Sequence, residues 1–92
     1  MATYSKVLTV TATDYATDPD VVIPFVPKVI RACNMDGGDI AFVSMDGRTD
    51  AAALSDDVKS PSSVQQWTWQ LATKVWLKTS SANVDVQIIA ES

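Results

Sequence analysis

Apolar and polar residues alternate with a period of two along most of this 92-residue chain. Because successive side chains of a β-strand point to opposite faces, this period predicts strands. The alternating or apolar segments are 6–12, 28–33, 40–45, 64–71, 73–79 and 84–90. In the first of them, Leu8, Val10 and Ala12 share one face, and Val7 and Thr9 lie on the other.

Turn-forming residues separate these segments. Residues 13–20 are predicted to be a loop, residues 34–39 contain two glycines, and Asp46-Gly47 is a second clear turn signal. The strands 28–33 and 40–45 flank the glycine-rich turn, so they are predicted to form a hairpin with each other.

Two stretches leave alternatives open. Pro24 and Pro27 interrupt the apolar run 21–33, and proline cannot donate to a ladder. This run is therefore an edge strand, a bent strand or two strands at a corner. Residues 50–59 have no clear period, and we favour a strand or loop there over a short helix capped by Asp50.

About seven short strands result, and no helix is long enough for a parallel crossover. The prediction is an all-β fold, an antiparallel β-sandwich of which the jelly roll is one form. Residues 1–92 are expected to form a single domain, because a chain of this length has room for one core.

Charge and composition exclude several partner classes. The net charge is −4 and the seven basic residues are scattered, so nucleic acid is not an expected partner. No apolar run approaches the roughly 20 residues of a membrane span, and no signal peptide is expected at the N-terminus. Cys33, the single cysteine, fits synthesis in a reducing cytosol and is read as a buried small hydrophobe.

Candidate chemistry is sparse. The chain has no histidine, which excludes Ser-His and Cys-His nucleophilic arrangements, and no metal-ligand pattern. The aspartates cluster in predicted loops, including Asp36 and Asp39, and are read as solvated turn residues, with a calcium site or catalysis as alternatives. We therefore predict no catalytic, cofactor-binding or metal-binding residues, and a protein that is not an enzyme.

The tryptophans carry more information. Trp67 and Trp69 share a face and are expected in the core, with a sugar-stacking platform or a subunit contact as alternatives. If Val75 and Leu77 face the core, Trp76 faces outward between basic neighbours. Trp76 with Lys74 and Lys78 is predicted to form an interface, because tryptophan is enriched at interface hot spots; packing on the second face and ligand binding are the alternatives.

The segment 6–12 has its only charge at Lys6. As an edge strand it is predicted to pair with a neighbouring chain, so Val7 and Thr9 are further interface candidates. The same interpretation predicts that Trp76→Ala, or deletion of residues up to Ala12, weakens assembly.

The segments 21–30, 38–44 with Asp46-Gly47, 73–78 and 84–90 share a recognisable strand pattern. In this pattern they resemble small β-rich virion proteins of tailed bacteriophages. It implies a non-enzymatic virion structural protein, made in the host cytoplasm. The specific expectation is a capsid decoration (cement) subunit that contacts the major capsid protein or other virion proteins, as a homo-oligomer. The alternatives are a head-tail adaptor or fibre-base subunit, and a carbohydrate-binding module that uses surface tryptophans.

Overall fold

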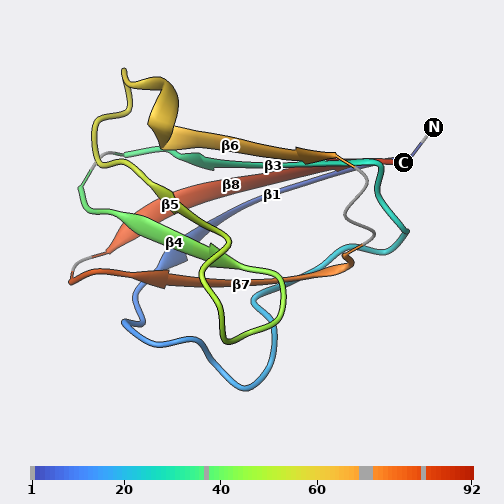
Figure 1. The fold of residues 1–92 in the computed structure, drawn as a ribbon, viewed down its shortest axis with the longest axis horizontal. Helices are drawn as coiled ribbons and strands as arrows, with labels where there is room; N and C mark the ends of the chain where they lie inside the picture. Colours follow the sequence, from blue (N-terminus) through green and yellow to red (C-terminus); the bar gives the residue numbers. More distant parts are fainter. Residues whose placement is uncertain (1, 37, 69–71, 82) are drawn as a thin grey trace.

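The computed structural model describes residues 2–36, 38–68, 72–81 and 83–92 (Figure 1). These described residues contain eight strands and one short 3-10 helix, η1, at Pro61–Ser63. The strands are β1 (Thr3–Val10), β2 (Val21–Val22), β3 (Val29–Asn34), β4 (Ala41–Ser44), β5 (Ala52–Leu54), β6 (Val64–Thr68), β7 (Lys74–Thr79) and β8 (Val84–Glu91). No helix among the described residues is long and apolar enough to cross a membrane.

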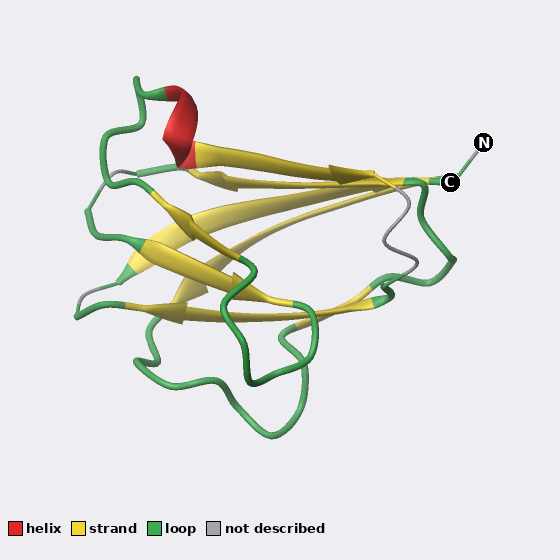
Figure 2. Ribbon diagram, viewed as in Figure 1, coloured by secondary structure: helices red, strands yellow, loops and turns green. Residues whose placement is uncertain are grey.

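The strands form two antiparallel sheets of four, which lie face to face as two layers (Figures 1 and 2). The first sheet has the order β1-β8-β3-β6 and the second sheet the order β2-β7-β4-β5. This is the strand order of an eight-stranded jelly roll, in which two Greek keys wrap around one core. The predicted β-sandwich is confirmed, with one strand more than the sequence pattern indicates.

Strict alternation builds the core between the sheets. Along β8, every second residue from Val84 to Ala90 is fully buried, and the residues between them are half-buried on the outer face. On β7, Val75 and Leu77 are buried as expected. Leu54 from the short strand β5 is also fully buried, so the core draws on both sheets.

The predicted hairpin between residues 28–33 and 40–45 is wrong. β3 pairs with β8 and β6 in the first sheet, whereas β4 pairs with β7 and β5 in the second. The buried Asn34 supports the crossing between the sheets: its side-chain amide donates to the carbonyls of Asp39 at 2.7 Å and Ser55 at 3.1 Å. In a jelly roll, most successive strands lie in different sheets, and turn residues alone do not distinguish a hairpin from such a crossing.

The two ambiguous stretches are resolved. The proline-interrupted run is two strands at a corner: β2 belongs to the second sheet and β3 to the first, and Pro24 and Pro27 lie between them. Residues 52–54 of the second stretch form the strand β5, paired with β4. β2 and β5 are the two shortest strands, and both lie at sheet edges, where pairing on one side suffices.

Candidate functional site

A hollow of about 380 Å³ opens on the outer face of the second sheet. Its residues come from the loop between β1 and β2, the turn between β4 and β5, and strand β7. They are Tyr15, Ala16, Thr17, Asp46, Gly47, Arg48 and Trp76. The volume lies in the range of small-molecule binding sites, roughly 300–1,000 Å³.

The β1–β2 loop is held against β7 at both of its ends. The backbone N–H of Thr79 donates to the carbonyl of Ala12 at 2.9 Å. The backbone N–H of Leu77 donates to the Asp20 carboxylate at 2.8 Å, so a side chain takes the place of a ladder acceptor. The loop therefore lies along the sheet and forms one wall of the hollow.

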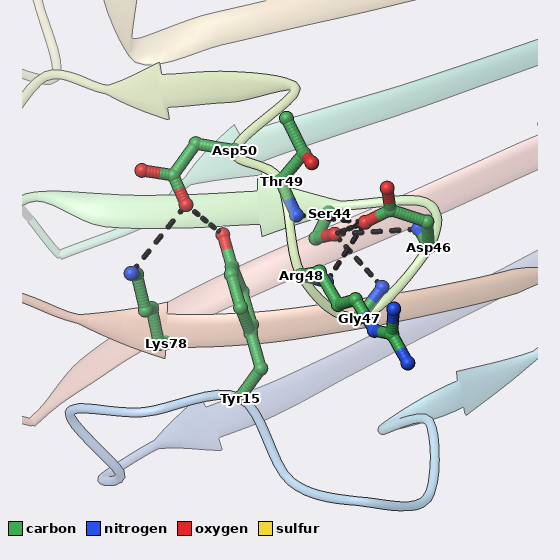
Figure 3. A network of polar contacts seen from close by, with 8 residues as sticks. All are labelled: Tyr15, Ser44, Asp46, Gly47, Arg48, Thr49, Asp50 and Lys78. Atoms are coloured by element: carbon green, nitrogen blue, oxygen red, sulfur yellow. Dashed lines mark hydrogen bonds and ion pairs between the residues drawn. The ribbon is translucent and has the colours of Figure 1, made fainter.

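The loop is also anchored in its middle, through Tyr15 (Figure 3). Its hydroxyl donates to Asp50 Oδ1 at 2.5 Å, and Lys78 Nζ lies 3.5 Å from the same oxygen. The ammonium group is 4.6 Å from the centroid of the Tyr15 ring and 5.3 Å from that of Phe42, both cation–π distances. Burial, together with the hydrogen bond to Asp50, raises the pKa of Tyr15 above its usual range.

Asp46 organises the opposite wall, as Figure 3 shows. Its Oδ1 accepts hydrogen bonds from the backbone N–H groups of Thr49 and Arg48, each at 2.8 Å, and from the Ser44 hydroxyl at 2.9 Å. These donors stabilise the ionised carboxylate and hold the pKa of Asp46 well below its ordinary value. Ser44 Oγ accepts in turn from the N–H of Gly47 at 3.0 Å.

Trp76 lies beneath this turn. Gly47 has φ +79°, and a Cβ built on it would lie 3.0 Å from Cε2 of the indole ring. Glycine therefore permits both the left-handed conformation and the close approach of the turn to the ring. The indole Nε1 is buried and has no hydrogen-bond partner among the described residues. Buried polar groups are nearly always paired, so this N–H is exceptional.

The hollow has a charged rim. Arg48 is exposed, and its guanidinium makes no hydrogen bond or ion pair within the described part of the chain. Asp46 is also exposed at the same turn. The site thus combines an indole floor with a carboxylate, a guanidinium and the Thr17 hydroxyl, an arrangement that can bind a polar ligand on an aromatic surface.

The predicted interface residues lie on two opposite faces. Trp76, Lys74 and Lys78 point outward from β7 in the second sheet, where Trp76 and Lys78 are half-buried. Val7 and Thr9 point outward from β1, the edge strand of the first sheet. The structure does not bring the two groups together, and one flat partner surface cannot contact both.

Other candidates have structural roles. Asp36 accepts from the N–H groups of Gly38 and Asp85, each at 2.9 Å, and Asp39 accepts from those of Ser81 at 2.7 Å and Ile40 at 2.8 Å. Both aspartates thus support turns, as predicted. No group of three or more potential metal ligands occurs among the described residues.

The burial of Cys33 and of the other tryptophans differs in part from the prediction. Cys33 is only half-buried, because the alternation along β3 directs Ile30 and Ala32 inward and Cys33 outward. Trp67 is half-buried against the core. Trp69 lies outside the described residues.

The sequence pattern missed the hollow. It identified Asp46-Gly47 as a turn and Trp76 as an outward residue, but it did not place one on the other or single out Tyr15 and Arg48. The only available signal was the Asp-Gly pair, because glycine after aspartate marks a positive φ that a turn over a ring requires.

The strand order and the hollow together define a jelly-roll domain with a concave polar and aromatic site on one outer face. A scan against protein-family models, a search of curated proteins and a search of solved structures each find no match.

Proposed function

We propose that the chain is a non-enzymatic structural subunit of a tailed-bacteriophage virion, which decorates the capsid in symmetric multiples. The observation that carries this proposal is the composition of the outer face of the first sheet. The jelly-roll strand order adds support at the level of fold analogy, because viral capsid domains are among the proteins that use it. The strand pattern of the sequence resembles that of small phage virion proteins, and this similarity supports the same assignment.

Two rows of outward side chains cross all four strands of this sheet. By register they are Val7, Gln87, Cys33 and Val64, and then Ser5, Ile89, Arg31 and Gln66. Val7 is 54% exposed and Val64 39% exposed, so apolar groups are accessible at both edges. Arg31 is the only charged residue in the two rows, and it donates to Gln66 Oε1 at 2.8 Å.

A face of this kind suits contact with another protein. The solvated face of an antiparallel sheet is normally polar, whereas interface centres are depleted of charge. The chain as a whole is acidic, yet the acidic residues Asp85 and Glu91 lie toward the two ends of this face. The proposed occupant is the outer surface of the shell formed by the major capsid protein.

The test is co-sedimentation of the protein with capsid shells of the phage that encodes it. A Val7→Asp, Val64→Asp double variant places two charges on the face and should weaken shell binding at least tenfold, about 1.4 kcal/mol. Val22→Asp is the matched control, because Val22 is 56% exposed but belongs to the second sheet. Equal binding by all three proteins contradicts this face, and binding to isolated tails instead of shells assigns the protein to an adaptor or fibre-base position.

A further inference from the structure

We propose that the hollow beside Trp76 binds an uncharged carbohydrate, through one pyranose ring held between the indole and the polar rim. The site lies on the second sheet, away from the proposed shell-binding face, and the inference does not depend on that function. Its motivation is the combination of shape, charge and an indole ring at one place.

Charge indicates a neutral ligand. The rim residues Asp46 and Arg48 carry opposite charges, and behind the wall Asp50 is neutralised by Lys78 at 3.5 Å. Neither an anion nor a cation is favoured where charges of both signs lie together. A polar, uncharged molecule can use the carboxylate as an acceptor and the guanidinium as a donor at adjacent positions. Sugar hydroxyls fit this requirement, because each one both donates and accepts.

The floor of the hollow supplies the apolar part of the recognition. A pyranose ring has a face of C–H groups that packs on an aromatic ring, and tryptophan combines a large apolar surface with a polar N–H. The Nε1 of Trp76 is buried beneath Gly47, so the sugar is expected to contact the ring and not this N–H.

The hollow is also pre-formed. Tyr15 holds one wall through Asp50, and the hydrogen bonds to Asp46 hold the other. A site with walls that are already ordered loses little conformational freedom on binding, so a ligand of monosaccharide or disaccharide size can bind measurably. The volume of about 380 Å³ matches a ligand of that size.

The test follows the indole N–H resonances of the ¹⁵N-labelled full chain during titration with glucose, galactose, mannose, N-acetylglucosamine and their disaccharides. Trp76→Phe identifies the Trp76 resonance among those of the three tryptophans. The expected result is a saturable shift of the Trp76 resonance with at least one sugar. Shifts confined to the other two tryptophans, or no saturable shift with any sugar, would overturn the proposal.

The variant Arg48→Ala provides a second test of the proposed sugar site. The Arg48 side chain holds nothing in place among the described residues, so the variant should fold normally and raise the Kd for the sugar at least tenfold. Lys59→Ala is the control, because it removes an exposed cation from the loop before η1, outside the hollow. Equal affinities for Arg48→Ala and Lys59→Ala would overturn the proposed site, and so would preference for an acidic sugar over all neutral ones. These titrations contain no shells, so their failure is distinguishable from failure of the proposed function.

Discussion

At the scale of single residues, one carboxylate organises the turn that shapes the hollow. Asp46 accepts hydrogen bonds from two backbone N–H groups and one hydroxyl. Without Asp46, these three donors would need water as their partner. Gly47 completes the turn with the positive φ that lets the backbone lie on Trp76. The lowered pKa of Asp46 means that the folded state prefers the ionised carboxylate more strongly than the unfolded state does.

This preference predicts an acid-dependent stability. A group with a lowered folded pKa stabilises the fold fully above its unfolded pKa of 3.8, and this stabilisation is lost as the pH falls through the folded pKa. Asp46→Asn retains a side-chain oxygen as acceptor but removes the titration. We expect the free energy of unfolding of Asp46→Asn to depend less steeply on pH between about pH 5 and pH 2.

Urea denaturation at a series of pH values measures this difference. The other carboxylates titrate in both proteins, so the difference between the two curves is the quantity to compare. Parallel curves over the whole range would show that the turn does not prefer the ionised form of Asp46.

At the scale of elements, β1 is both long and exposed along one edge. Its eight residues pair with β8 over their full length, and among the described residues its other side has no strand neighbour in the first sheet. Lys6 lies opposite the buried Ile88, on the face of β1 that also carries Leu8 and Val10. Lys6 is nevertheless exposed, and a lysine on an edge strand is one of the devices by which natural sheets discourage unwanted pairing.

Removing that charge should increase self-association. We expect Lys6→Val to self-associate at a concentration at least tenfold lower than the wild-type chain, because the edge strand then carries no charge along its length. Sedimentation velocity over a concentration series measures the effect. Lys59→Val is the control for loss of a positive charge, and equal association of the two variants would mean that Lys6 does not guard the edge.

Deletion of residues up to Ala12 was predicted to weaken assembly, and the pairing of β1 changes how that result would be interpreted. β1 covers the whole of β8, and Val10 belongs to the core. Removing the segment would therefore expose core side chains as well as an edge, and a loss of assembly would not identify an interface. Point variants such as Val7→Asp separate the two effects.

At the scale of the whole molecule, the two ends of the described chain meet. The backbone N–H of Ser92 donates to the carbonyl of Ala2 at 2.9 Å, and the N–H of Ala2 donates to Ser92 Oγ at 2.7 Å (Figure 1). β1 and β8 are thus neighbours although they lie at opposite ends of the sequence. Pairing of this kind is dominated by long-range contacts, which are slow to form during folding.

A circular permutant tests this closure. Joining the ends by a short flexible linker and opening the chain in the exposed loop between Asp57 and Val58 should preserve the β-sheet circular dichroism spectrum, because no strand is interrupted. Opening the chain within β8, between Gln87 and Ile88, should abolish the cooperative unfolding transition. Similar behaviour of the two permutants would contradict the central position of β8.

Much of the local structure follows from the order of residues alone. The alternation at Val75, Trp76 and Leu77 places each side chain on its correct face, because side-chain direction along a strand has a period of two whatever the strand pairs with. The Asp46-Gly47 turn is equally local, since it depends on glycine's access to positive φ. All-β architecture and the outward position of Trp76 were therefore predictable.

The pairing of the strands and the set of residues that line the hollow are determined by the tertiary structure. The turn at 34–39 has the composition of a hairpin, yet β3 and β4 lie in different sheets, because burial of both strands against the rest of the core outweighs the preference of a short connection. The hollow joins Tyr15, Asp46 and Trp76 from three segments far apart in sequence. A period of two specifies which face a side chain occupies, but only the packing of the two sheets specifies what lies across from it.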